Sequence, residues 1–336
     1  MANGKKDTYW IGFDLGGTKM LASVFDPSGK IVGSAKRRTK GNEGAEAGLE
    51  RITKTVTDAL KEAAVKPNRL TGIGMACPGP LDLEQGILLE APNLGWSQVP
   101  ICQTLESVFE CPTYLMNDVD AGVFGEYSAG AARKERCVLG VFPGTGIGGG
   151  CVYQGRVLTG AAQSCMEFGH IPVNPQGEIC GCGRRGCLET VASRLAIASQ
   201  AAKAAYRGEA PYLLKEVGTD LADIRSGALA ASVKAGDKVV EHIIRDAAAT
   251  LGRAIGGVVN LLAPDIIVLG GGLVEAMPDL YCEEVKAAAK QTAMPSYADG
   301  LRVKPAELGD DASVTGAAAW ARTLTEDPTN PTKRRT

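Results

Sequence analysis

The chain has 336 residues, of which 43 are glycine, 10 are cysteine and 2 are histidine. Glycine is almost twice as frequent as the roughly 7% of ordinary proteins, but it follows no three-residue period, which excludes a collagen-like chain. The hydrophobic fraction of 45% suits a globular core and excludes a disordered chain. The formal net charge of −2 provides no strong field to attract nucleic acid or anionic lipid.

No segment has the pattern of a targeting or membrane-spanning element. Asp14 and Lys19 interrupt the first apolar stretch, so no signal-peptide core follows the N-terminus. The longest uncharged run, 138–155, holds seven glycines and a proline, which predicts a buried strand with a glycine-rich loop and not a transmembrane helix. We therefore expect a cytoplasmic protein with no membrane partner, a compartment in which disulfides are uncommon.

The first half of the chain predicts three strands followed by alternating helices and strands. The strands are expected at 9–13, 20–25 and 31–39, separated by the segment 14–19 and by an Asp-Pro-Ser-Gly turn. Apolar residues at helical spacing predict a helix over 49–63. Further strands are expected at 70–75 and 114–116, with a helix at 119–129 after them.

The same order of elements restarts in the second half. A strand over 137–142 ends in the glycine-rich segment 143–150, and short strands at 151–153 and 157–158 flank a turn. Helices are expected over 188–205, 239–262 and 312–324, and a buried strand over 266–269. The repeated start indicates a duplication of topology, so the sequence predicts an α/β protein of two similar domains.

Three glycine-rich loops follow predicted strands, at 14–19, 143–150 and 270–272. Glycine lets successive backbone N–H groups converge on one phosphate, and Thr18 and Thr145 add hydroxyl donors. Hairpin chemistry explains any one such loop equally well. Three of them together favour a nucleotide site.

The glycine-rich loops match neither the Walker A motif nor the dinucleotide-binding motif in its required context. The sequence contains no Walker A motif, G-x-x-x-x-G-K-[ST]. Gly144, Gly146 and Gly149 match the dinucleotide pattern G-x-G-x-x-G, but that pattern must open a helix and here it runs into a predicted strand. The context argues against a dehydrogenase.

Three of the cysteines lie close to a histidine, in the spacing H-x9-C-x-C-x4-C formed by His170, Cys180, Cys182 and Cys187. Three thiolates and one imidazole form a tetrahedral zinc site, and the surrounding glycines let so short a loop fold around one ion. Four protein ligands leave no open position, so the zinc would be structural. The alternative is a set of reduced thiols or a redox pair. The other seven cysteines are scattered and are expected to be small core residues.

One acidic pair follows a predicted strand. Asp118, after Asn117, stands at the carboxyl end of that strand, where open α/β sheets place their sites. The alternative for Asp118 is a helix N-cap. Asp120 competes with Asp118 for a catalytic role.

Two glutamates flank the cysteine–histidine cluster. Glu167 lies three residues before His170, so a bound metal would fix its position. Glu189 lies two residues after Cys187 at the start of a predicted helix, where interaction with the helix dipole is the alternative explanation. Asn93 follows a proline and has a turn as its alternative role.

Several motifs of one family stand in order along the chain: D-L-G-G-T at 14–18, C-P-G-P-L-D at 77–82, A-P-N-L-G-W at 91–96, N-D at 117–118, G-T-G-I-G-G-G at 144–150, E-F-G-H at 167–170, C-G-C-G-R-R-G-C-L-E at 180–189 and G-G-G at 270–272. Through them, residues 9–322 resemble the ROK family (repressors, open reading frames, kinases), most closely its bacterial glucokinases. The resemblance implies an actin-like ATPase fold of the hexokinase/RNase H-like type, with two similar α/β domains and an interdomain cleft. The smaller domain would comprise 1–125 and 312–336, and the larger 126–311.

The resemblance also implies ATP-dependent phosphorylation of the 6-hydroxyl of a hexose, glucose being favoured, with Mg²⁺ as cofactor and a structural Zn²⁺. Asp118 would be the catalytic base. The sugar would be bound by Gly79, Asn93, Asn117, Asp118, Glu167, His170 and Glu189. The nucleotide and its metal would be bound by Asp14, Gly16, Gly17, Thr18, Lys19, Gly144, Thr145, Gly146 and, near the adenosine, Gly270, Gly271 and Gly272. The zinc would be held by His170, Cys180, Cys182 and Cys187.

Alternatives remain within the same family. The acceptor could be N-acetylglucosamine, N-acetylmannosamine, mannose or fructose, and polyphosphate could replace ATP. A sugar-sensing repressor is disfavoured because its DNA-binding domain has no room before residue 14 and the acidic balance opposes nucleic acid. The family implies a homodimer or a dimer of dimers. The segment 162–166 lacks the glycines usual before E-x-G-H, and Asp120 stands where the family often has Asn, which bears on sugar selectivity and not on the reaction class.

Overall fold

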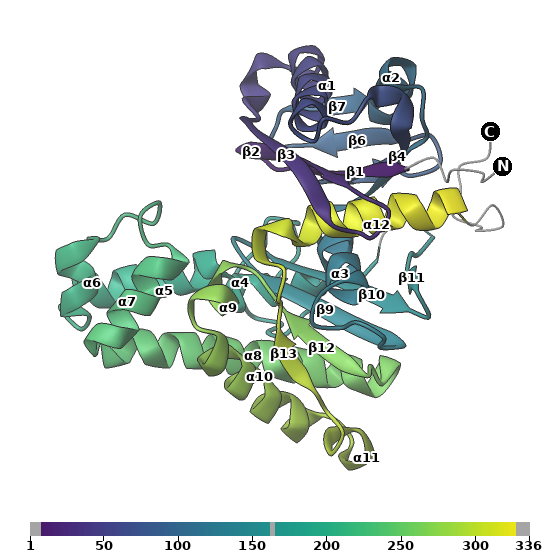
Figure 1. The fold of residues 1–336 in the computed structure, drawn as a ribbon. Helices are drawn as coiled ribbons and strands as arrows, with labels where there is room; N and C mark the ends of the chain where they lie inside the picture. Colours follow the sequence, from purple (N-terminus) through teal and green to yellow (C-terminus); the bar gives the residue numbers. More distant parts are fainter. Residues whose placement is uncertain (1–7, 162–164, 327–336) are drawn as a thin grey trace. The chain divides into compact units, whose positions relative to one another are not determined.

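The structure is a computed structural model that describes residues 8–161 and 165–326 (Figure 1). The chain divides into two compact units. Unit 1 comprises Met1–Arg133, Val157–Cys165 and Asp310–Thr336, and unit 2 comprises Lys134–Arg156 and Met166–Gly309. Each unit has a sheet and a hydrophobic core of its own.

The sheet of unit 1 has five strands in the order β3-β2-β1-β4-β8. The strands are β1 (Tyr9–Leu15), β2 (Lys19–Phe25), β3 (Ile31–Arg38), β4 (Leu70–Cys77) and β8 (Thr113–Asn117). β1, β2 and β3 are antiparallel, whereas β4 is parallel to β1 and β8 is parallel to β4. All five were expected from the sequence.

Side-chain alternation in β1 places one helix on each face of this sheet. Ile11 and Phe13 face the core that contains residues of α1 (Ala45–Glu62). Gly12 faces α12 (Ala312–Glu326), and a Cβ on Gly12 would lie only 1.8 Å from the carbonyl oxygen of Val314. Glycine is therefore required here so that the backbone of α12 can pack directly on the sheet.

A small antiparallel sheet in unit 1 was not predicted. It comprises β5 (Leu81–Asp82), β6 (Ile87–Ala91) and β7 (Trp96–Val99). These strands are too short to give a periodic pattern. The remaining helices of the unit are α2 (Ile101–Phe109), α3 (Asp118–Ser128) and the short 3-10 helices η1 (Gly41–Glu43) and η2 (Pro67–Arg69).

The second five-stranded sheet has the order β11-β10-β9-β12-β13. Its strands are β9 (Cys137–Pro143), β10 (Ile147–Tyr153), β11 (Arg156–Val157), β12 (Ile266–Leu269) and β13 (Val303–Pro305). β10 is antiparallel to β9, whereas β12 is parallel to β9 and to β13. The strand order therefore repeats that of unit 1, which confirms the predicted duplication of topology.

The core of unit 2 lies between its sheet and a layer of helices. The long helix α8 (Lys238–Leu262) packs against α10 (Pro278–Thr292) and α5 (Arg194–Tyr206). The shorter helices are α4 (Glu189–Ala192), α6 (Pro211–Glu216), α7 (Ser226–Ala235), α9 (Gly272–Ala276), α11 (Pro295–Ala298) and η3 (Phe168–His170), and η4 (Gly309–Asp311) precedes α12. Figure 1 shows α8 and α10 running side by side beneath the strands.

The structure corrects two elements of unit 2. The helix predicted over 188–205 is divided at Ser193, because the Ser193 side chain accepts a hydrogen bond from the Ala196 N–H and so begins a new helix. The loop predicted over 143–150 is shorter, since residues from Ile147 onward pair with β9 as part of β10. In β10, a Cβ on Gly149 would lie 2.7 Å from the Phe168 side chain, so this glycine serves close packing.

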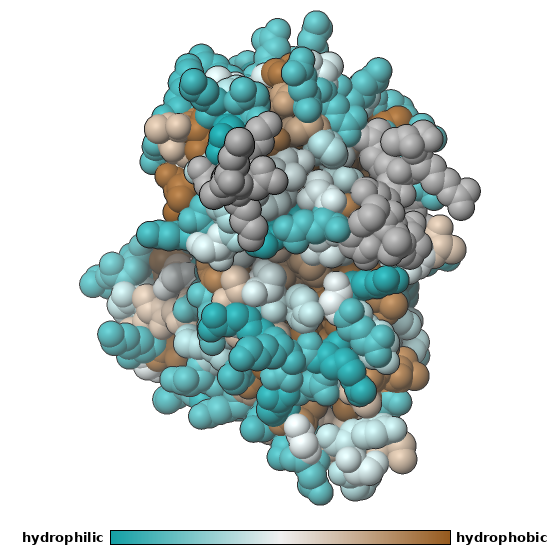
Figure 2. All heavy atoms as spheres, turned by 45° about the vertical axis from the view of Figure 1, so that its right-hand side comes forward, coloured by the Kyte–Doolittle hydropathy of each residue, from teal (hydrophilic) through white to brown (hydrophobic). Residues whose placement is uncertain are grey.

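One face of the molecule is mostly hydrophilic (Figure 2), and most of the cysteines outside the cysteine–histidine cluster are buried. No helix within the described residues is long and apolar enough to cross a membrane. Hydrophilic residues dominate the face shown in Figure 2, with apolar residues in scattered groups. Of the seven cysteines expected in the core, five are buried, and Cys165 and Cys282 are half-buried.

Candidate active site and metal loop

The carboxyl ends of the parallel strands in unit 1 bring polar side chains to one edge of the sheet. Asp14 of β1 is aligned with Ala76 of β4, and Cys77 of β4 is aligned with Asn117 of β8. Asp118 follows as the first residue of α3. Sequence positions more than 100 residues apart are thereby placed at the edge where α/β sheets build their sites.

The start of α3 assigns separate roles to neighbouring residues. Asn117 is the N-cap, and its Oδ1 accepts hydrogen bonds from the N–H groups of Val119 (2.9 Å) and Asp120 (3.3 Å). The N-cap role that was the alternative for Asp118 thus belongs to Asn117. Asp118 is partly exposed, and its Oδ1 accepts from the Val119 N–H at 2.9 Å, whereas Asp120 is only 5% exposed. Accessibility therefore favours Asp118 for contact with a substrate.

Both burial and a neighbouring charge act on the Asp14 carboxyl. Burial, followed by the negative charge of Asp118, raises the pKa of Asp14 to about 6, although Lys19 opposes the shift. Because the charge of Asp118 disfavours ionisation of Asp14, a cation beside Asp14 would be stabilised.

Asp14→Asn is expected to stabilise the metal-free protein at neutral pH. The pKa of Asp14 is raised on folding, so the folded state loses stability as the pH rises from about 4 to about 6. At pH 7.5 the variant should be more stable by about 1–3 kcal/mol, from roughly 1.4 kcal/mol per pKa unit with allowance for partial exposure. Urea unfolding at pH 7.5 and 4.5 measures the difference, which should shrink at the lower pH. A less stable variant at pH 7.5 would contradict the burial of this charge.

The first glycine loop is a tight connection between β1 and β2. The Gly16 N–H donates to the Lys19 carbonyl at 3.0 Å, and Thr39 Oγ1 donates to the Gly16 carbonyl at 2.6 Å. A Cβ on Gly17 would lie 3.9 Å from Cβ of Asn93, so the Asn93 turn lies beside the loop. Thr18 is exposed.

Two further residues of this loop region have defined partners. Lys19 Nζ forms an ion pair of 2.9 Å with Asp310, in the turn before α12. The sequence analysis assigned Asp310 no role at the site, because 291 residues separate it from Lys19. Gly79 has φ +87°, and a Cβ there would lie 1.9 Å from the Glu90 carbonyl oxygen. Close packing against the backbone of β6 therefore explains why this position is a glycine.

In unit 2, the two remaining glycine loops lie together. β9 and β12 are parallel neighbours, so the segment Gly144–Gly146 after β9 and the segment Gly270–Gly272 after β12 meet at one edge. A Cβ on Gly270 would lie 2.1 Å from the Phe142 ring, and Gly271 has φ +82° with its Cβ position 2.8 Å from the Pro143 carbonyl oxygen. These contacts explain the glycine requirement independently of any ligand.

The N-terminal end of α5 contacts the Gly144–Gly146 segment. The Arg194 backbone N–H donates to the Gly144 carbonyl at 2.8 Å, and the Arg194 guanidinium donates to Thr145 Oγ1 at 2.9 Å. Sequence reasoning missed Arg194. A pocket of about 840 Å³ lies beside it, lined by Arg194, Leu195, Leu221, Ala222, Arg225, Ser226, Gly227, Gly272, Glu275 and Ala276.

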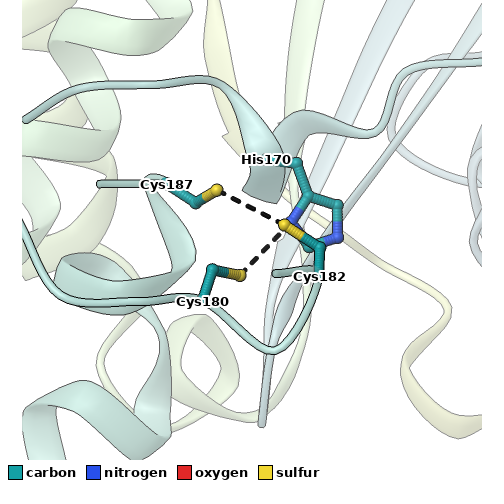
Figure 3. Close-up of side chains that lie close together, drawn as sticks. All are labelled: His170, Cys180, Cys182 and Cys187. Atoms are coloured by element: carbon teal, nitrogen blue, oxygen red, sulfur yellow. Dashed lines mark hydrogen bonds between the residues drawn. The ribbon is translucent and has the colours of Figure 1, made fainter. Parts of the chain in front are cut away.

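The structure brings the four predicted metal ligands together (Figure 3). One ligand atom from each of His170, Cys180, Cys182 and Cys187 lies within 4.8 Å of the others. The separation is 3.6 Å from Cys180 Sγ to His170 Nδ1 and 3.7 Å from Cys182 Sγ to Cys187 Sγ. Sulfurs 2.3 Å from a tetrahedral zinc are about 3.8 Å apart, so the side chains present fit such an ion.

Protonation of the metal-loop thiols depends on their local setting. Burial raises the pKa of the Cys180 thiol to about 12, whereas the Arg184 backbone N–H lowers the pKa of Cys182. Short backbone bridges from Pro172 to Cys187 and from Ile179 to Arg185 close the loop around the four side chains. These bridges bring the three cysteines and His170 to one side of the loop.

Glu189 connects the metal loop to the glycine loop. Its Oε2 accepts a hydrogen bond from the Ile147 N–H at 3.1 Å, and its Oε1 lies 3.6 Å from Cys180 Sγ. A Cβ on Gly146 would lie 2.2 Å from Glu189 Oε2. Glu167 is exposed, and its carbonyl accepts from the His170 N–H at 3.0 Å.

Gly146→Ala is expected to push the Glu189 carboxylate away from the Ile147 N–H. Loss of one hydrogen bond to a charged group should lower the free energy of unfolding by about 1–2 kcal/mol. Gly144→Ala is the matched comparison, because the nearest atom in its path is 3.9 Å away, and its effect should be smaller. Urea unfolding of both variants measures the difference; equal effects would contradict the role of Glu189.

The segment before the E-F-G-H motif is only partly described. Residues 162–164, which include Gln163, lie outside the described residues. Met166 has φ +59° and packs against the core of unit 2. The expected influence of this segment on sugar selectivity remains a prediction.

Two sheets of one topology, each with a glycine-rich turn after its first strand, define the class of actin-like ATPase folds. Residues 10–324 match the ROK family, and the chain belongs to that family. One similar structure is the crystal structure of a ROK family glucokinase from Streptomyces griseus in complex with glucose and AMPPNP. It has a TM-score of 0.79 and 29% sequence identity to this chain, and the match covers 94% of this chain and 99% of the glucokinase chain. The predicted fold class is confirmed.

Relatives in this family include kinases and repressors. A glucokinase of Halalkalibacterium halodurans is 34% identical over 319 residues, which cover 92% of this chain and 94% of that protein. A xylose repressor of Caldicellulosiruptor bescii is 28% identical over 92% of this chain and 77% of the repressor. The activity of this chain must therefore be argued from its site.

Proposed function

We propose that the protein is an ATP-dependent sugar kinase that transfers the γ-phosphoryl group to the 6-hydroxyl of glucose. The observation that carries the proposal is the pair of half-buried carboxyl groups of Asp118 and Asp14, at the carboxyl ends of β8 and β1. Phosphoryl transfer needs one group to accept the hydroxyl proton and another locus to hold a cation, and this edge supplies carboxylates for both.

Each residue of unit 1 has a distinct part in the proposed reaction. Asp118 accepts the proton of the sugar hydroxyl and orients that oxygen, while the N-cap bonds of Asn117 hold the start of α3 in place. The Asn93 side chain donates to and accepts from other hydroxyls. Mg²⁺ prefers oxygen ligands, so the Asp14 carboxylate would hold it, and the ion would neutralise phosphate charge.

Unit 2 supplies the proposed nucleotide contacts. The Gly144 N–H donates to the Gly146 carbonyl at 2.8 Å, so the N–H groups of Thr145 and Gly146 and the Thr145 hydroxyl would bind phosphates. The pocket beside Gly272 is large enough for adenosine. That pocket favours ATP over polyphosphate as donor, because polyphosphate has no group to fill it.

The metal loop would hold a structural zinc that orders sugar-binding groups. With His170 Nδ1 facing Cys180, its Nε2 is left to bind a hydroxyl. Each carboxylate oxygen of Glu189 has a second lone pair, so it can accept from a sugar hydroxyl while it holds Ile147. Glu167, exposed next to η3, would add a further acceptor.

A panel of sugars with ATP and Mg²⁺ tests the proposal. Glucose should give the highest kcat/KM, compared with N-acetylglucosamine, N-acetylmannosamine, mannose and fructose. ADP formation must depend on the sugar. Turnover with none of these sugars, together with specific binding to an operator DNA, would replace the kinase by a regulator.

Assembly is a separate expectation. We infer a homodimer or a dimer of dimers from membership of the family. Analytical ultracentrifugation at micromolar concentration checks it, and a monomer would contradict it.

A further inference from the structure

The Arg194 side chain of unit 2 lies beside the proposed phosphate-binding loop. Arg194 begins α5, and both its backbone and its side chain are bonded to the Gly144–Gly146 segment, at 2.8 Å to the Gly144 carbonyl and 2.9 Å to Thr145 Oγ1. The guanidinium is therefore fixed beside the loop to which the phosphates are assigned.

The Arg194 guanidinium lines the same pocket as one carboxylate, that of Glu275, but is not paired with it. Within the described parts of the chain it forms no ion pair, whereas Arg207 at the other end of α5 pairs with Glu209 at 3.0 Å and Arg302 pairs with Glu135 at 2.6 Å. A guanidinium has five N–H donors, and the bond to Thr145 uses one of them. The others can bind an anion.

The pocket next to Arg194 indicates which kind of anionic ligand could contact the guanidinium. Its walls combine apolar side chains, such as Leu195 and Leu221, with Ser226 and the backbone of Gly272. Arg225, also on the wall, donates its Nε–H to the Ala222 carbonyl at 3.1 Å. Because Arg194 borders both this pocket and the glycine loop, a ligand that occupies both must pass its guanidinium.

We propose that Arg194 binds a phosphate oxygen of the nucleotide, with Thr145 Oγ1 fixing the orientation of the guanidinium. This assignment rests on the proposed function and adds a phosphate-binding residue to it. Arginine suits the role because its planar fork binds phosphate oxygens in pairs. The N-terminal end of α5 adds a positive potential at the same position.

Comparison of ADP with adenosine tests the assignment, because only ADP has phosphates. Arg194→Gln should weaken ADP binding by about 10- to 100-fold, as expected for loss of a charge-assisted hydrogen bond. Adenosine affinity should change by less than about twofold, and KM for the sugar should be unchanged. Arg194→Lys should restore part of the ADP affinity. Competition against a fluorescent ADP analogue measures both ligands.

Arg207→Gln is the matched control, since it removes one positive charge from the same region of the chain, at the distal end of α5, where Glu209 already neutralises that charge. It should leave ADP affinity unchanged. If Arg194→Gln weakened ADP and adenosine equally, or weakened neither while the wild-type protein bound ADP, the phosphate contact would be wrong and the kinase proposal would stand. A wild-type protein that bound neither ligand would overturn the nucleotide donor and this assignment together.

Discussion

Asp118→Asn is expected to lower kcat with glucose and ATP by about 10²- to 10⁴-fold, the usual cost of removing a general base. The amide keeps the size of the side chain and can still accept from the Val119 N–H, so α3 should begin as before. KM for glucose should change much less than kcat. Steady-state kinetics with a coupled ADP assay measure both constants.

The control for this experiment is Asp311→Asn, an exposed aspartate of the same unit that precedes α12. It should retain full activity. If Asp118→Asn retained more than about a tenth of the wild-type kcat, another group would have to accept the proton. Asp120 is only 5% exposed within α3, so its carboxylate is not accessible to a sugar hydroxyl.

Cys182→Ser is expected to release the bound metal and to reduce kcat/KM for glucose by about 100-fold or more. One ligand of four is lost, and binding of a structural metal ion contributes directly to the stability of its loop. The loop carries His170 and leads into Glu189, so both proposed sugar contacts would lose their positions together. Zinc content by mass spectrometry and kinetics on the same samples measure the two effects.

Cys282→Ser is the matched control, a half-buried cysteine on α10 outside the metal loop. It should retain both metal and activity. A wild-type protein that contains no metal as purified and is fully active would show that the four side chains act as reduced thiols.

The strands of both five-stranded sheets except β13, and the longest helices except α10, could be predicted because each has a local pattern. β12 is a run of four apolar residues, and α8, a helix of 25 residues, carries its buried residues along one face. The duplication could be predicted from the order of these elements. β5, β6 and β7 could not, since strands of two to five residues have no resolvable period and are stabilised by pairing with one another.

In the candidate site, too, the residues of a short motif could be predicted, whereas the contacts between side chains and backbone could not. The spacing of one histidine and three cysteines over residues 170–187 predicted a cluster within one short loop, and the four ligand atoms do converge. The N-cap assignment could not be read from residue types, because Asn117 and Asp118 both favour that position and only the backbone direction at α3 selects Asn117.

The sequence by itself determined the family, the two α/β domains of one topology and the cysteine–histidine cluster, because local periodicity and close spacing are preserved in any conformation of the chain. The tertiary structure alone decided which distant residues meet: Lys19 with Asp310, Glu189 with Ile147, and Arg194 with Thr145. These pairs form because the packed sheets place the carboxyl ends of their strands, and the helices and turns beside them, at common edges. Side-chain contacts of that kind depend on register and helix packing, which no local pattern encodes.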